Sequence, residues 1–188
     1  NGGNSDLQPD FVWIKSRNAT RDHRLLDSTR GVQKELVSNS TSAEYTESTG
    51  FTAFQSDGFQ HGGANGYGAS GETYVSWQWK ANGGTTTTND SSATSVGNVD
   101  SIYQANTTAG FSIVTFPSDN TAGRTVAHGL GVAPTMMITK GRAQASGWYT
   151  YHKGAGANKW LTLNNTNAGA TNTGIWGNTD PTSSIFTI

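Results

Sequence analysis

A short stretch near the start of the sequence returns later in the chain, and this internal repeat limits the folds that the chain can adopt. Residues 9–17 read PDFVWIKSR and residues 134–142 read PTMMITKGR. Residues 9–43 align with residues 134–168 without a gap, and nine of the 35 positions are identical. In the first copy these positions are Pro9, Lys15, Arg17, Gly31, Lys34, Leu36, Asn39, Thr41 and Ala43. The match predicts the same local structure for both copies.

The second copy decides how an ambiguous segment of the first copy folds. Taken alone, residues 23–38 fit either a helix or strands. The aligned residues 148–163 hold two runs of β-forming residues around a Gly-rich turn at 153–157, which is typical of a β-hairpin. We therefore predict a hairpin for residues 23–38, with its turn at residues 29–31.

Two further strands are predicted beside the copies. Residues 110–116 are rich in β-forming side chains, and residues 73–80 alternate along the chain, which places alternate side chains on opposite faces of a strand. Trp77 and Trp79 share a face with Val75, and we expect that face to be core.

These patterns predict an all-β fold, an antiparallel β-sandwich such as a jelly roll, built from two related halves. The first β repeat spans residues 1–80, and the second spans residues 108–188. Residues 81–107 are rich in Gly, Thr, Ser and Asn and are predicted to be a polar connector. We expect the two halves to form one sandwich.

The two copies carry different flanking strands. Strand 73–80 follows the first copy, whereas strand 110–116 precedes the second copy, and neither has a counterpart at the other copy. Three explanations stay open: the halves complete each other, flanking sequence has been removed, or open ends pair with neighbouring subunits by strand addition.

Composition argues against several classes of function. The chain has no cysteine, so disulfides and thiolate metal sites are excluded. Its net charge is −1 and no basic cluster is visible, so nucleic-acid binding is not expected. No apolar run approaches the roughly 20 residues of a membrane span, so membrane insertion is not expected.

The sequence shows no arrangement of catalytic or metal-binding residues. The histidines, His23, His61, His128 and His152, form no close pair or HExxH motif, so we expect no metal and no cofactor. Acidic residues are almost absent from the second copy. Asp22 and Asp27 of the first copy are interpreted as turn caps and as partners of Arg24 or Arg30. We therefore predict no catalytic residue.

Glycan binding is the one ligand function that the residues suggest. It uses exposed aromatic rings, and the predicted second hairpin is rich in them. Trp148 and Tyr149 are neighbours in a strand and must point to opposite faces. The candidate glycan-binding residues are Trp148, His152 and Trp160.

Several motifs together resemble a family of tail-fibre and virion structural proteins of marine phages, cyanophages included. They lie at residues 8–17, 26–31, 71–81, 110–115, 128–134 and 181–184. The resemblance implies a virion or extracellular location and a lectin-like sandwich, and it brings no catalytic residue with it. It also implies partners: other copies of the chain, other virion proteins and cell-surface glycans.

The leading hypothesis is a non-enzymatic structural or adhesion module of a virion, such as a tail fibre or decoration protein, that binds cell-surface glycans. The first alternative is a subunit of an extracellular filament or shell, assembled by β-strand pairing between subunits. The second alternative is a glycan-degrading enzyme, which would need a pair of carboxylates in a cleft.

Overall fold

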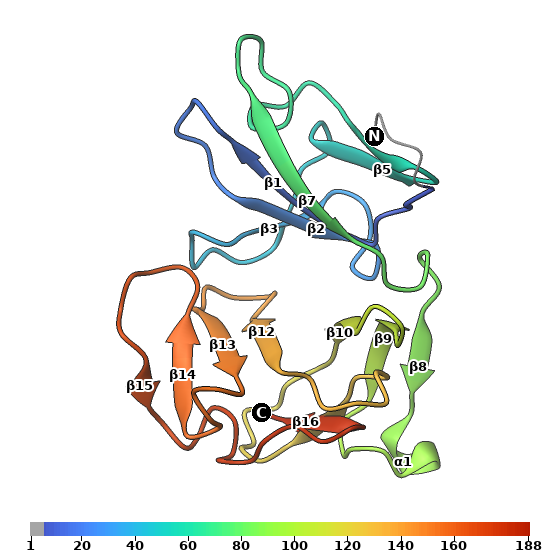
Figure 1. Cartoon of the computed structure of the whole chain (residues 1–188), viewed down its shortest axis with the longest axis vertical. Coiled ribbons are helices and arrows are strands. Elements are labelled where there is room, and N and C mark those ends of the chain that lie inside the picture. The colour runs from blue at the N-terminus through green and yellow to red at the C-terminus, as the bar shows by residue number, and fades with distance from the viewer. Residues whose placement is uncertain (1–5) are drawn as a thin grey trace.

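The structure is a computed structural model that describes residues 6–188. Its strands pair in antiparallel ladders, and Figure 1 shows them gathered in two parts, one above the other. We call residues 6–80 the first unit and residues 81–188 the second unit. The predicted fold class, an all-β sandwich-like fold, is confirmed.

The first unit is a sheet with a hairpin packed on one face. The sheet has the strand order β4-β3-β2-β1-β7, and β5 pairs with β6 in the hairpin. The strands are β1 (Phe11–Ser16), β2 (Arg24–Asp27), β3 (Lys34–Val37), β4 (Tyr45–Thr46), β5 (Phe51–Gln55), β6 (Gly58–His61) and β7 (Tyr74–Trp79).

Strand β1 divides its side chains between the two faces of this sheet. Val12 and Ile14 point toward the hairpin and are buried in a core with Phe51 of β5. Phe11 and Trp13 point the other way and are only partly buried. This split follows from the two-residue period of a strand. We call the face that carries Phe11 and Trp13 the outer face of the sheet.

The second unit contains the remaining strands and a single helical turn. Its sheets have the strand orders β10-β9-β8, β12-β13-β14-β15 and β11-β16. Within residues 6–188 the helix is only one turn long, so no helix there has the length and apolar character to cross a membrane. The elements are β8 (Thr87–Asn89), α1 (Ser91–Thr94), β9 (Ser101–Asn106), β10 (Phe111–Thr115), β11 (Thr125–Ala127), β12 (Met136–Lys140), β13 (Trp148–His152), β14 (Lys159–Thr162), β15 (Ala170–Thr171) and β16 (Ile185–Thr187).

Each unit has a core of its own. Val126 of β11 and Phe186 of β16 form one cluster of the second unit, with Val114 of β10 and Met137 of β12 packed against them. A separate cluster joins the units, where Trp148 of β13 contacts side chains of the first sheet. The halves therefore lie one against the other, each with its own core, and do not share a single sandwich.

The internal repeat is visible in the order of the strands. The sequence β1-β2-β3-β4 of neighbouring strands in the first sheet recurs as β12-β13-β14-β15 in the second unit. Strands β3 and β14 begin and end 125 residues apart, as do β4 and β15. The segment that could have been a helix forms β2 and β3, so the hairpin prediction is confirmed.

Two of the identical positions hold the hairpins in the same way. The side-chain oxygen of Asn39 accepts a 2.8 Å hydrogen bond from the backbone N–H of His23, and Asn164 accepts one of 2.8 Å from Trp148. A positive φ angle at the turn glycine is also shared, since Gly31 and its counterpart in the second copy have φ values of 101° and 84°, a region that favours glycine.

The polar connector is shorter than the sequence predicted. Residues 87–89 and 101–106 form β8 and β9, which pair with each other, and β9 also pairs with β10. The prediction of a connector over residues 81–107 is therefore wrong for these segments. Threonines favour strands because of their β-branched side chains, and a run of them at 85–88 starts β8.

The buried carboxylate of Asp10 holds the chain at the junction of the units. It is fully buried and accepts hydrogen bonds from the hydroxyl of Ser28 (2.7 Å) and from the backbone N–H groups of Ala81, Gly83 and Gly84 (2.7–2.8 Å). Gly83 and Gly84 have φ values of 62° and 83°, which directs successive N–H groups toward one anion. The turn that leads into the second unit is thus fixed to the start of β1.

Gln104 of β9 continues this junction from the second unit. Its fully buried side-chain amide donates to the hydroxyls of Ser28 (2.9 Å) and Thr29 (2.8 Å) in the first unit. Its oxygen accepts from the N–H of Gly84 at 2.9 Å. Asp10 and Gln104 therefore share two partners, and we call these two side chains with Ser28 and Gly84 the junction cluster.

An ion-pair network also links the two units. Arg142, in the second unit, binds both carboxylate oxygens of Glu44 at 2.9 and 3.0 Å. Glu44 also accepts from Arg30 at 2.9 Å, and Arg30 is paired with Asp27. The interpretation of Asp27 as a partner of Arg30 is confirmed.

We expect Asn39→Ala and Asn164→Ala each to lower the free energy of unfolding by about 1–2 kcal/mol, because each leaves a backbone N–H at the start of a hairpin without its acceptor. The exposed Asn167 serves as a control, and Asn167→Ala should change stability by less than about 0.5 kcal/mol. Urea unfolding measures all three. Equal effects of all three variants would contradict the shared role of Asn39 and Asn164.

We expect Asp10→Asn to destabilise the protein by about 2–3 kcal/mol, because an amide cannot accept from all three backbone N–H groups. Gln104→Ala should also destabilise it. Since the two side chains share partners, the double variant should lose clearly less than the sum of the single losses. Urea unfolding of the four proteins gives the coupling, and additive effects would contradict the junction cluster.

Candidate functional site

The structure buries Trp148, one of the predicted glycan-binding residues. Only 4% of Trp148 is exposed, and its indole N–H donates to the backbone oxygens of Val37 and Ser40, both at 3.0 Å. It packs beside Leu25 and Leu36 between the units. The prediction that Trp148 is exposed for glycan binding is therefore wrong, because the first unit covers the outward face of this strand.

The other two predicted residues lie on different faces of their sheet. His152 is exposed, and its Nδ1 accepts from the N–H of Gly154 at 3.1 Å. Trp160 is partly buried and stacks edge-to-face on Tyr149, with ring centroids 5.1 Å apart. The register of β13 and β14 places Trp160 on the face of Tyr149 and Tyr151, opposite to His152. Trp148, His152 and Trp160 therefore form no common site.

A different set of aromatic rings is exposed, on the outer face of the first sheet. Trp77 and Trp79 of β7 are 46% and 40% exposed. The prediction that they are core is wrong. The hairpin β5–β6 covers the opposite face of the sheet, where it supplies aromatic side chains such as Phe51 and Phe59. The tryptophans are left on the side that the hairpin does not cover.

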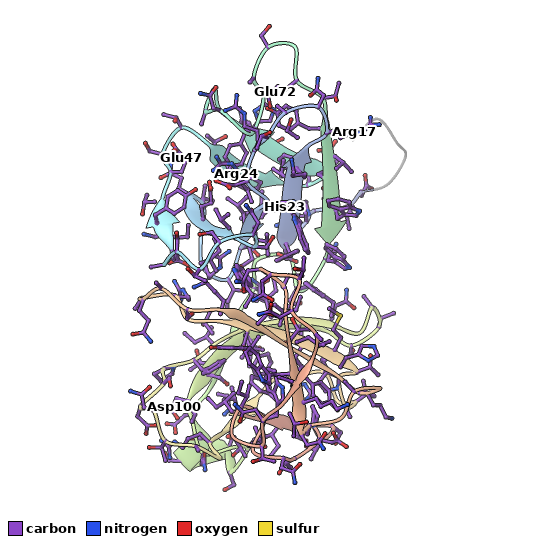
Figure 2. The ribbon with its side chains drawn as sticks, turned by 90° about the vertical axis from the view of Figure 1, so that its left-hand side faces the viewer. Arg17, His23, Arg24, Glu47, Glu72 and Asp100 are labelled. Carbon is purple, nitrogen blue, oxygen red and sulfur yellow. The ribbon has the colours of Figure 1, made fainter. Side chains whose placement is uncertain are left out.

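The first group on this face is built around Trp13. Its ring lies edge-on to Trp77, with centroids 6.0 Å apart, and close to the imidazole of His23 at 6.1 Å. The indole N–H of Trp13 donates to Nδ1 of His23 at 3.3 Å. Burial and the nearby Lys15 charge lower the pKa of His23, which keeps the imidazole neutral and its Nδ1 able to accept. Figure 2 labels His23 in the upper part of the molecule.

The second group bridges the two units. Phe11 contacts Trp79 edge-to-face with ring centroids 5.5 Å apart, and Trp79 stacks on Phe111 of β10 at 6.0 Å and an interplanar angle of 21°. Aromatic pairs in these geometries stabilise each other beyond the area that they bury. Trp77 and Trp79 are thus held by neighbours while part of each indole stays open. We call Phe11, Trp13, Trp77 and Trp79 the aromatic face.

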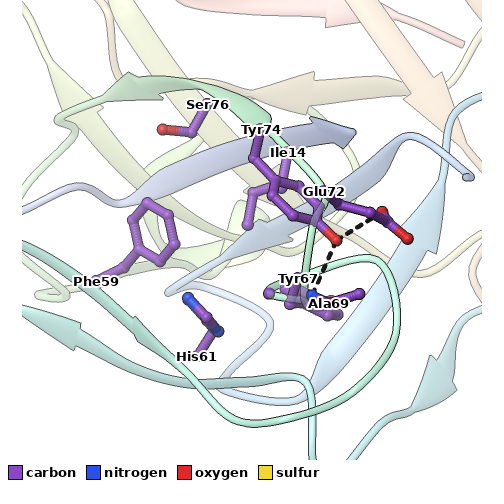
Figure 3. A pocket seen from close by; sticks show the side chains of 9 residues that line it. Ile14, Phe59, His61, Tyr67, Ala69, Glu72, Tyr74 and Ser76 are labelled. Atoms are coloured by element: carbon purple, nitrogen blue, oxygen red, sulfur yellow. Dashed lines mark hydrogen bonds between the residues drawn. The ribbon is translucent and has the colours of Figure 1, made fainter. Parts of the chain in front are cut away.

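A cleft of about 280 Å³ lies on the other side of the first sheet, between the sheet, β6 and the loop that precedes β7. Figure 3 shows Tyr74 between the carboxylate of Glu72 and the backbone of Ala69. The Tyr74 hydroxyl donates to Glu72 at 2.8 Å and accepts from the N–H of Ala69 at 3.2 Å. The cleft is lined by Ile14, Phe59, His61, Tyr67, Gly68, Ala69, Glu72, Tyr74 and Ser76.

Glu72 is the carboxylate among the residues that line this cleft, and it is held ionised. Arg21 donates to it twice, at 2.6 and 2.9 Å. The hydrogen bonds from Arg21 and Tyr74 lower the pKa of Glu72 to about 2. The carboxylate therefore acts as a hydrogen-bond acceptor at neutral pH, and it is not a proton donor.

A second carboxylate of the first unit, Glu35, is fully buried. It is bonded to Arg24 and to the hydroxyls of Tyr45 and Tyr67. Burial and the Glu35 charge raise the pKa of both tyrosines well above the ordinary value. The Arg24 guanidinium also lies over the Tyr67 ring, 5.1 Å from its centroid. This network ties β2, β3 and β4 together inside the unit.

The histidines make contacts within the fold. His128 is 2% exposed, its Nδ1 accepts from the N–H of Leu130, and its other ring nitrogen contacts the oxygen of Thr182. In the part of the chain that the structure describes, no three His, Asp or Glu side chains are grouped to hold a metal ion.

Comparison with known proteins identifies the family. Residues 3–188 match the family described as "Domain of unknown function (DUF7483)". The match spans almost the whole chain, and the protein belongs to this family. No curated protein and no solved structure matches the chain significantly.

We expect Glu72→Gln to destabilise the protein at neutral pH, because Arg21 loses its ionised partner. The folded-state pKa of Glu72 is depressed, so its stabilising effect is present above the unfolded-state pKa near 4.5 and is lost as the pH falls toward 2. The difference between the denaturant midpoints of wild type and variant should therefore become smaller as the pH is lowered from 7 to 5 and to 3. Arg21→Gln should show the same trend, and a gap that does not depend on pH would contradict the ion pair.

Proposed function

We propose that the protein is a non-enzymatic adhesion module that binds glycans through the aromatic face. The observation that carries the proposal is the exposure of two tryptophans on one side of a single strand, at 46% and 40%. Pyranose rings have apolar C–H faces that stack on indoles, and an indole offers both a flat apolar surface and a polar N–H.

The arrangement of β7 suits an extended ligand. Trp77 and Trp79 are two residues apart, so their backbones are separated by about 7 Å along the strand. This spacing lets neighbouring sugar units of one chain contact both rings. Trp13 and Phe11 support the two indoles from β1, so that little rotamer freedom remains to be lost on binding.

The location and partners of the module follow from the resemblance of its motifs to phage tail-fibre and virion structural proteins. We propose a virion or extracellular location, with host cell-surface glycans and other virion proteins as partners. The family match assigns no function, and this part of the proposal rests on those motifs.

A second candidate function is that of a subunit assembled by β-strand pairing. It is supported by sheet edges in both units, since β7 and β12 each end a sheet in the strand orders of residues 6–188. Edges of this kind are templates for pairing with another chain.

We expect Trp77→Ala and Trp79→Ala each to weaken glycan binding at least about tenfold, because each removes an aromatic anchor. A glycan array with wild type identifies the ligand, and titration of that ligand with the variants measures the loss. Val132→Ala is the control, since Val132 is an exposed apolar residue of the second unit. Circular dichroism checks the fold of each variant. Wild type that binds no glycan, or variants that bind like wild type, would contradict the proposal.

A further inference from the structure

Strand β12 occupies in the second unit the place of β1 in the first. Both are followed by the same series of strands, β2-β3-β4 and β13-β14-β15. Strand β1 is paired on both sides, with β2 and with β7. Strand β12 pairs with β13, and no other strand of residues 6–188 pairs with its second edge.

The backbone bonds show which residues of β12 face this edge. Lys153 donates its N–H to the oxygen of Thr135 at 2.8 Å, so the polar groups of Thr135 point toward β13. Polar groups alternate in direction along an antiparallel strand. Those of Met136, Ile138 and Lys140 therefore point away from β13, toward the edge.

The repeat-equivalent residues of β1 use these groups to bind β7. Arg17 donates its N–H to the oxygen of Thr73 at 2.7 Å, and the same alternation directs the polar groups of Phe11 and Trp13 toward β7. Phe11 and Trp13 are the counterparts of Met136 and Ile138, 125 residues earlier. The two edges thus match in the direction of their hydrogen-bonding groups.

The side chains of β1 and β12 differ in exposure, as expected if β12 lacks the neighbouring strand that β1 has. On β1, Trp79 and Trp77 of β7 lie against Phe11 and Trp13, with ring centroids 5.5 and 6.0 Å apart. On β12, the counterparts Met136 and Ile138 are 52% and 39% exposed.

Strands β12 and β10 approach the same core from separate sheets. Val114 of β10 and Met137 of β12 pack against the same core of Val126 and Phe186. Figure 1 shows β10 and β12 in the same part of the second unit, with β13 on the far side of β12.

We propose that the edge of β12 is an acceptor site for one extended strand of the β7 type, donated by a protein other than a copy of this chain, since the chain's own β7 is already paired with β1. Such a strand carries large apolar residues at alternate positions, as Val75, Trp77 and Trp79 do in β7. Its backbone pairs with Met136 and Ile138, and its alternate side chains cover theirs. Pairing of this kind takes affinity from the backbone and specificity from the alternate side chains. The site is separate from the aromatic face, so glycan binding and strand binding can succeed or fail independently.

The test adds a labelled peptide of residues 71–80 to the full chain and follows fluorescence anisotropy. We expect saturable binding with one peptide per chain, at least tenfold tighter than binding of a shuffled peptide of equal composition. Amide hydrogen exchange followed by NMR should then slow at Met136, Ile138 and Lys140. The amides of Met137 and Thr139, which already face β13, should change little.

Two controls separate strand pairing from apolar adhesion. A peptide N-methylated at alternate residues keeps its side chains but loses backbone N–H donors, so it should bind at least tenfold more weakly. This control needs no change in the protein. Ile138→Pro removes one amide from the edge without touching the β13 ladder, and it should weaken binding by a similar factor.

The proposal is overturned if no saturable binding occurs, if the shuffled or methylated peptide binds equally well, or if the slowed amides lie in β1. It is also overturned if the chain alone forms dimers that protect the β12 amides, because the donor would then be a second copy of this chain.

Discussion

A single buried carboxylate fixes how the two units meet. Asp10 lies at the start of β1 and accepts hydrogen bonds from three backbone N–H groups of the turn that follows β7. Gln104 reaches the same turn from the second unit. An unpaired carboxylate in such a site would be costly, so the turn has to keep its shape for the charge to stay satisfied. The strand, the turn and the second unit are therefore positioned together, and Trp148 and Arg142 add further contacts between the units.

The repeat made much of the fold predictable. Its second copy is rich in β-forming residues, which settled the structure of residues 23–38, and its identities at Asn39 and Gly31 mark bonds and turns that both copies need. The strands at 87–89 and 101–106 were missed because they lie in a stretch rich in Gly, Thr, Ser and Asn, which was interpreted as a connector. The pairing of β8, β9 and β10 into one sheet depends on contacts between separate segments, which composition does not reveal.

The candidate site was harder to predict. Alternation correctly placed Trp77 and Trp79 on one face of a strand, but it cannot tell which face another layer will cover. The hairpin β5–β6 brings its own phenylalanines, so the other face became core. Trp148 was misjudged for the same reason, because the partner that covers it is the first unit. The exposed aromatic face could have been inferred only by knowing where the hairpin packs.

The stack of Trp79 on Phe111 places one residue of the aromatic face in contact with the second unit. A ligand that changes this stack also changes the free energy of the contact between the units, and the reverse holds by the same amount. Mechanical load that separates the units would then alter affinity for the ligand. In the adhesion role proposed above, the affinity for the ligand would then depend on the force that acts across the two units.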